Sequence, residues 1–344
     1  MPKQSRDWVH PVACCLVAVT GVLLSFGALV TTYEAAMAVP DWPGTYGHNM
    51  FLFPWAEWFF GPWDLFLEHG HRLLGATVGI ITLMAAGFAW GTKQSAVVRG
   101  LAVAAVLLVV LQGVLGGLRV LLDDKTIAKV HACTGPLFFG VAVAIATLTS
   151  AKIKSDRGGL RVLDRWPSTA GWLAGGLLVA AYVQLVAGAQ LRHVDATVSH
   201  ATFRWLVGGH LAGAALVAIL SLAVVAEAFG LLACFRRAEP AGRARQRWAL
   251  GVLCLVVCQI ALGCGAWVVS WGLPLGLLPD SLAAALPEPT GVTVARSQFS
   301  AAVVTGHVLL GMLILAASVV VAIISGIAGE PERFAVPSRR RAFA

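Results

Sequence analysis

The sequence predicts an all-α membrane protein in which eight transmembrane helices form two four-helix bundles, related as a parallel repeat. Three observations support this prediction: the composition, the length of the apolar runs and the distribution of basic residues. The 344 residues are 58% hydrophobic and only 12% charged, and the mean hydropathy is +0.80. Soluble globular domains carry about twice that share of charged residues, so the chain belongs in a bilayer.

Eight apolar runs are long enough to cross the roughly 30 Å of hydrocarbon in a bilayer, which takes about 20 residues. The first run follows two basic residues and has no small-residue cleavage site after it. We therefore expect a retained helix rather than a signal peptide, which would be removed. The runs cover residues 11–31, 69–91, 101–120, 128–150, 171–191, 204–228, 248–269 and 301–324.

A net charge of +8 would suit a nucleic-acid-binding protein, but the basic residues fall in alternate loops. The long loop 32–67 on the opposite side holds none. By the positive-inside rule, this distribution places both termini in the cytoplasm. We expect a multi-pass protein of the bacterial plasma (inner) membrane, surrounded by lipid and with no nucleic-acid partner. The basic groups lie in residues 3–6, 93–99, 152–165, 236–247 and 333–341.

A weak internal repeat divides the chain into two halves. Three odd-numbered runs carry a glutamine four residues before a glycine, a pattern whose favoured interpretation is plain helix packing. These pairs are Gln112 and Gly116, Gln184 and Gly188, and Gln259 and Gly263. The predicted units are a bundle at 1–150, a basic cytoplasmic linker at 151–167, a bundle at 168–330 and a basic cytoplasmic tail at 331–344. Because each half has an even number of helices, the repeat is parallel, about an axis along the membrane normal.

Each even-numbered run has one histidine near its start, and these are His71, His131, His210 and His307. All four lie at similar depth toward the outer leaflet, because the even-numbered helices run from outside to inside. A buried ionisable group normally faces the bundle interior with a partner, and neutral imidazole is an axial ligand of haem iron. We therefore expect His71 with His131, and His210 with His307, to form two pairs of haem-iron ligands. A zinc site is disfavoured, since it would want converging cysteine or carboxylate partners.

Charged residues accompany the first pair. Glu68 lies three residues before His71, on the same helix face and one turn closer to the outer surface. Its carboxylate could transfer protons or stabilise positive charge on a substrate, or it could simply favour the helix start. His69 points away, toward the surface or into a supporting position. Several arginines near the outer interface could pair with haem propionates or extend along the interface: Arg72, Arg119, Arg192 and Arg204.

Two outer segments could cover these sites. The first outer loop is dense in aromatic residues from Trp42 to Trp63, which is typical of a segment at the headgroup level and also suits a lid over the first-half site. The segment 271–298 holds four prolines and could cover the second.

The sequence resembles the haem A synthase family over nearly its whole length. The resemblance rests on the residues 26–30 (FGALV), 40–43 (PDWP), 68–72 (EHGHR) and 112–119 (QGVLGGLR), together with His131, His210 and His307. It implies that His71 and His131 flank the substrate haem, that His210 and His307 ligate haem b, and that Glu68 is functionally important. It also implies the reaction, in which the C8 methyl of haem O is oxidised to the formyl group of haem A with water as the oxygen source.

The resemblance further implies haem O synthase as a partner, with terminal oxidase assembly factors and a second copy of the chain as further candidates. Two other classes stay open from the residues alone. A di-haem quinone-linked cytochrome b would also use two histidine pairs, but it would more often place them at two depths. A transporter with parallel repeats is disfavoured, because the spans show no break near the midplane.

Overall fold

The computed structural model describes residues 8–151, 153, 168–194, 198–232, 242–271 and 297–327, and these are helical apart from loops and one isolated bridge between Thr45 and His48. Nearly all of the predicted linker, the whole predicted tail and most of the outer segment 271–298 lie outside the described residues. The helices are α1 (Val9–Thr32), η1 (Ala35–Met37), α2 (Trp55–Phe60), α3 (Trp63–Gly91), α4 (Ala96–Leu121), α5 (Lys125–Thr149), α7 (Thr169–Arg192), α8 (His200–Ala228), α9 (Arg243–Trp271) and α11 (Gln298–Ile327).

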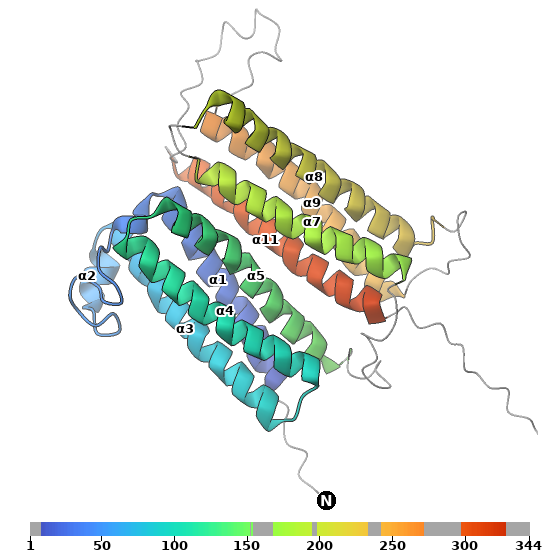
Figure 1. Ribbon diagram of the computed structural model, residues 1–344, viewed down its shortest axis with the longest axis horizontal. Helices are drawn as coiled ribbons and strands as arrows, with labels where there is room; N and C mark the ends of the chain where they lie inside the picture. The colour runs from blue at the N-terminus through green and yellow to red at the C-terminus, as the bar shows by residue number, and fades with distance from the viewer. Residues whose placement is uncertain are drawn as a thin grey trace, which may run out of the picture.

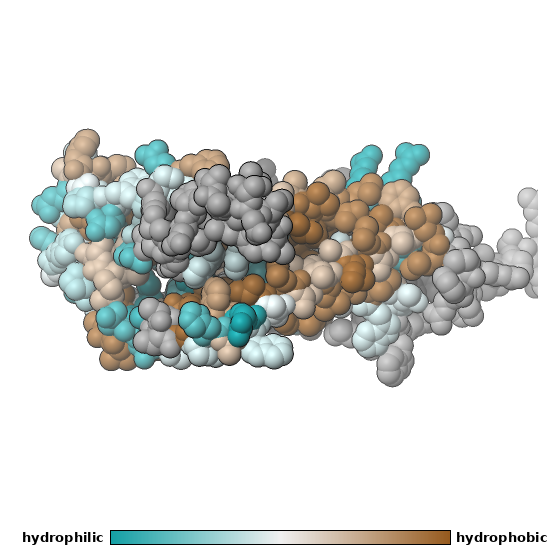
Figure 2. All heavy atoms as spheres, turned by 90° about the horizontal axis from the view of Figure 1, so that it is seen from above, coloured by the Kyte–Doolittle hydropathy of each residue, from teal (hydrophilic) through white to brown (hydrophobic). Residues whose placement is uncertain are grey.

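Eight of these helices are long and apolar enough to cross a membrane, as the sequence predicts. Large apolar side chains such as Leu107 (66% exposed) and Ile219 (62% exposed) project from the outside of the helices, where lipid would cover them. Figure 2 shows hydrophobic residues gathered on a broad flank, with hydrophilic residues mostly toward the side where Figure 1 shows α2. The chain is a multi-pass membrane protein.

Most helices begin before their apolar runs. Four begin at a side-chain cap: Ser95, Asp124, Ser168 and Ser199 each accept a hydrogen bond from a main-chain amide in the first turn. Such caps satisfy amides that the helix itself leaves free. The polar first turn therefore belongs to the helix although it lies outside the run. At α3 the difference is largest, since the helix begins at Trp63 and so includes Glu68.

The helices pack as two groups of four that follow the two halves of the chain (Figure 1). In the first group α1 packs against α3 and α5, and α4 packs against the same two helices. In the second, α7 and α9 each pack against both α8 and α11. The groups meet where α11 packs on α1 and α5, and where α5 packs on α7. In both groups the most extensive contact joins a helix to the histidine-bearing helix that follows it.

Each group has an apolar core of its own. Leu16, Val78 and Ile145 are buried in the first, and Leu177 and Val252 are buried in the second. A smaller cluster of α5 and α11 side chains, including Phe139 and Val319, joins the two groups. These cores fill the inner part of each group and leave the histidines toward the outer end.

Candidate functional site

The four histidines form two pairs of the same geometry. The ring centres of His71 and His131 lie 6.4 Å apart with the ring planes at 77°, and those of His210 and His307 lie 6.4 Å apart at 67°. In each group the two helices that carry the pair lie across the diagonal, because α3 packs on α1 and α4, and α8 on α7 and α9. Each pair therefore meets at the centre of its group.

The spacing suits a metal held between the two rings. Two imidazoles that bind one metal at about 2 Å through ring nitrogens have their ring centres about 6 Å apart. The Nδ1 atoms of His71, His131 and His307 are buried without a hydrogen-bond partner among the described residues, which calls for an explanation in a native protein. No group of three or more His, Cys, Asp or Glu side chains there could hold a metal. The donor sets present therefore fit a group with two axial ligands, such as haem.

Each histidine ring lies against a glycine of the preceding helix. A Cβ added to the glycine would lie 3.0 Å from the ring Cε1 of His71 and of His307. The same distance is 3.3 Å for His131 and for His210. Only glycine, which has no side chain, leaves room for the imidazole ring at these positions. The pairs are Gly27 with His71, Gly116 with His131, Gly188 with His210, and Gly263 with His307.

This contact repeats in every helix pair, although the glutamine that marks it in sequence does not. Gln112 donates from Nε2 to the main-chain oxygen of His131 (3.2 Å) and to Thr134. Gln184 donates from Nε2 to the main-chain oxygen of His210 (2.9 Å). These glutamines fix the histidine helix against the preceding one at the level of the ring. In α1 the corresponding position is Leu23, so the sequence repeat misses Gly27.

The surroundings of the two pairs differ in charge. Glu68 is 2% exposed; its Oε1 accepts a hydrogen bond from Arg72 at 2.8 Å, and its buried Oε2 has no partner among the described residues. The positive charge of Arg119 acts on Glu68, His71 and His131. In the second half, the one acidic residue that the structure describes is Glu227, which pairs with Arg245 where the chain leaves α8 and enters α9. Among the residues that the structure describes, a carboxylate therefore accompanies the first pair only.

The arginines predicted near the outer interface take different places. No hydrogen bond joins Arg119 to another described residue, and its positive charge interacts with Glu68. Arg192 donates from Nη2 to the main-chain oxygen of Ala28 and to Thr32, which commits part of its guanidinium to α1. Arg204 is exposed. A propionate role does not fit Arg72, because both of its terminal nitrogens already donate to the protein.

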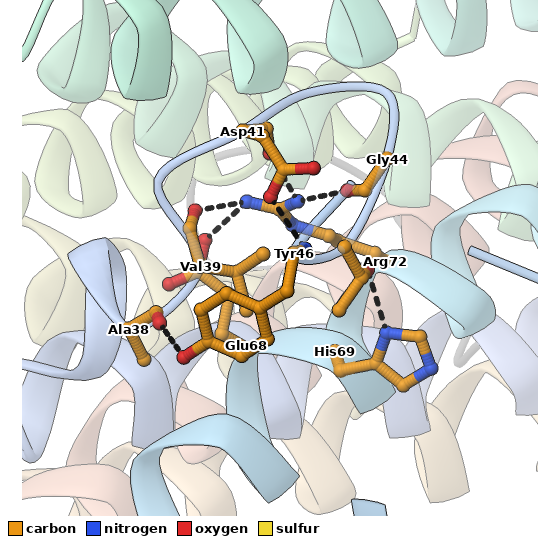
Figure 3. Close-up of polar contacts among 9 residues, drawn as sticks. Ala38, Val39, Asp41, Gly44, Tyr46, Glu68, His69 and Arg72 are labelled. Carbon is orange, nitrogen blue, oxygen red and sulfur yellow. Dashed lines mark hydrogen bonds and ion pairs between the residues drawn. The ribbon is translucent and has the colours of Figure 1, made fainter. Parts of the chain in front are cut away.

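His69 does not lie at the surface, one of the two places predicted for it. The side chain is 1% exposed, its Nδ1 lies 3.0 Å from the Thr45 hydroxyl, and its ring packs against Phe53 and Trp58. The first outer loop folds back onto α3 and so surrounds a side chain that helix geometry alone directs outward. His69 is a supporting residue that joins the loop to the helix (Figure 3).

His193 is a half-buried polar residue that no sequence pattern singled out. It follows α7 directly, and its pKa is lowered to about 4 because burial and the positive charges of Arg192, Lys129 and Arg119 all disfavour the protonated ring. These neighbours come from α4, α5 and α7, so His193 lies where the two groups meet. No pattern in the sequence distinguishes it from a loop histidine.

Comparisons with known proteins show what parts of the chain are similar to. Residues 62–219 match the model of a family described as "Cytochrome oxidase assembly protein". Heme A synthase of Shouchella clausii (strain KSM-K16) is 24% identical over 194 residues, which are 53% of this chain and 61% of that protein. The family model thus matches less than half of the chain, and the chain spans 61% of the length of that relative. The matched residues include Glu68, His71, His131 and His210, whereas His307 lies beyond them.

Proposed function

We propose that this chain is a haem A synthase, which oxidises the C8 methyl of haem O to a formyl group with oxygen taken from water. The observation that carries the proposal is the unequal charge around two equal histidine pairs. A pure electron carrier needs two haem sites but no buried carboxylate beside one of them. Glu68 is such a carboxylate, one turn from His71, and its Oε2 has no hydrogen-bond partner among the described residues.

In the first half, His71 and His131 would hold the iron of the substrate haem between them. Oxidation of a methyl group with water releases protons and electrons, so a base at the reacting edge is useful. The Oε2 atom of Glu68 is the unengaged acceptor that could take such a proton. Arg119 would pair with a propionate, and paired charges of this kind both bind and orient a ligand.

In the second half, His210 and His307 would hold haem b. Haem bound there would supply one-electron chemistry through its iron. The protein contributes a fixed ring orientation, since Gln184 and Gly188 hold His210 from one helix. Arg192 is the proposed propionate partner on this side through the part of its guanidinium that is not bonded to α1.

We place the enzyme in the bacterial plasma membrane with both termini in the cytoplasm and the two sites toward the outer leaflet. The basic segments that support this orientation come from the sequence. We take the two groups of helices as the functional units, one for the substrate haem and one for haem b. Haem O synthase would supply the substrate.

Co-expression with a haem O synthase, in a host without its own haem A synthase, tests the proposal. Extracted pigments are separated and their masses measured. Haem A should appear with the parent chain and with Glu227→Gln, and it should be absent with Glu68→Gln. If every sample holds only haem B and haem O while the protein carries two haems, the chain is a di-haem electron carrier instead.

A further inference from the structure

Arg72 joins the first outer loop to the carboxylate of the candidate site. Its Nη1 donates to the main-chain oxygens of Asp41 (2.6 Å) and Gly44 (2.8 Å). Its Nη2 donates to the main-chain oxygen of Val39 (2.7 Å) and to Glu68 Oε1 (2.8 Å). In Figure 3 the loop curves around the guanidinium of Arg72. A planar guanidinium offers its donors in fixed directions, so one side chain can hold several acceptors at once.

The loop segment Val39–Gly47 is also folded on itself. Both carboxylate oxygens of Asp41 accept main-chain hydrogen bonds, from Tyr46 at 2.8 Å and from Gly47 at 2.9 Å. The Tyr46 hydroxyl donates to the main-chain oxygen of Ala38. The loop therefore meets Arg72 as a formed turn whose main-chain oxygens already point inward.

The same segment reaches a second helix. The ring of Trp42 lies over Gly117 of α4, so close that a Cβ on this glycine would overlap it. Arg119 follows two residues later on α4. The loop thus extends from α3, where Arg72 and His69 hold it, to α4, and it covers the outer end of the helix pair that carries Glu68 and Arg119.

These contacts fix how Glu68 is presented. Its Oε1 accepts a hydrogen bond from Arg72, and its buried Oε2 has no partner in the part of the chain that the structure describes. An unpaired buried carboxylate is costly, and an ion pair with a hydrogen-bonded arginine offsets that cost. Without Arg72 the carboxylate would lose its fixed position and the loop would lose the donors to three of its main-chain oxygens.

We infer that Arg72 is a positioning residue that locks the Val39–Gly47 loop over the first-half site and holds Glu68 with only Oε2 available. The effect on Glu68 rests on the proposed function, whereas the effect on the loop does not. Two measurements separate them.

The first measurement tests whether Arg72 holds the loop in place. Val39 is 0% exposed, so the thiol introduced by Val39→Cys should be shielded from a membrane-impermeant maleimide while the loop is locked. After labelling of the native cysteines is subtracted, adding Arg72→Ala should raise the labelling rate of this thiol about tenfold or more. Adding Arg72→Lys should give a rate between those of the Val39→Cys chain and the Arg72→Ala chain. Arg99→Ala, at the inner end of the same group, is the matched control and should leave the thiol shielded. Unchanged shielding in the Arg72→Ala chain would overturn the lock.

The second measurement is the rate of haem A formation. Misplacement of a reacting group by about 1 Å can cost roughly 100-fold in rate, so Arg72→Ala should reduce haem A formation about 10- to 100-fold while haem b stays bound. Arg72→Lys should recover part of this loss, since it restores the charge without the fork of donors. Undiminished conversion in Arg72→Ala would overturn the positioning of Glu68. If the parent chain forms no haem A, the proposed function fails, and the thiol measurement still decides the lock.

Discussion

Gly263 and His307 lie so close that a Cβ on the glycine would be 3.0 Å from the Cε1 atom of the imidazole. Replacing this glycine by alanine must move the ring or the helix. Overpacking of this kind costs about 1–3 kcal/mol, so Gly263→Ala should bind haem b about 10- to 100-fold more weakly. Gly251→Ala on the same helix meets nothing within 4 Å and should retain haem. Haem titration of the two apoproteins checks this, and equal affinities would contradict the close contact.

Removal of either second-half histidine should abolish the haem b spectrum. His210→Ala or His307→Ala leaves one ring of the pair without its partner at 6.4 Å, and a haem needs both for axial ligation in this site. The control is His200→Ala, an exposed histidine ten residues earlier on α8. Absorption of the purified reduced protein gives the haem content. Undiminished haem in both variants would defeat the assignment of this pair.

Glu68→Ala should keep the fold and haem b but lose conversion. General base catalysis by one side chain contributes about 10²–10⁴-fold, and haem A formation should fall by that order. The control is Glu227→Gln, which alters a half-buried glutamate that pairs with Arg245 and leaves the outer sites untouched. Wild-type turnover in Glu68→Ala would remove this residue from the mechanism.

The turn in which Asp41 accepts hydrogen bonds from Tyr46 and Gly47 should become less stable as the pH falls. Although burial opposes it, hydrogen bonds from the amides of Gly47 and Tyr46 and the charge of Arg72 lower the pKa of Asp41 below its ordinary 3.8. A carboxyl whose folded pKa is lowered stabilises the fold above the unfolded pKa and loses that contribution as the pH falls through the folded value. Protection of the Tyr46 and Gly47 amides should therefore be complete well above pH 3.8, the ordinary value, and should drop as the pH falls below it.

Hydrogen–deuterium exchange, corrected for the intrinsic rate at each pH, measures this protection. Asp41→Asn should be less protected at the higher pH and should show a much smaller change on acidification. Equal pH dependence in both chains would show that Asp41 does not hold the turn.

The helices could be predicted because apolar length and charge distribution are local properties of the sequence. Helix ends such as Trp63–Leu67 could not, because aromatic and acidic residues at a helix start resemble a loop in sequence. The glycine contacts were visible at Gly116, Gly188 and Gly263 but were interpreted as helix packing. At Gly27 no glutamine marks the site.

The histidines could be singled out as candidates, but their surroundings could not. Arg72 lies on a helix face from which a propionate seemed reachable, and its real partners are main-chain oxygens of a loop far along the chain. Such oxygens have no side-chain signature in a sequence. His69 was partly misjudged for the same reason, because the loop that buries it is a tertiary feature.

The purified protein, reconstituted in lipid and supplied with haem O and an electron acceptor, gives the most direct test of the central claim. Mass analysis should find haem A with the parent chain. His71→Ala should form none, yet its haem b spectrum should match that of the parent. Haem A formed by His71→Ala at the parent rate, or haem b lost from this variant while the fold persists, would contradict the division into a substrate pair and a fixed pair.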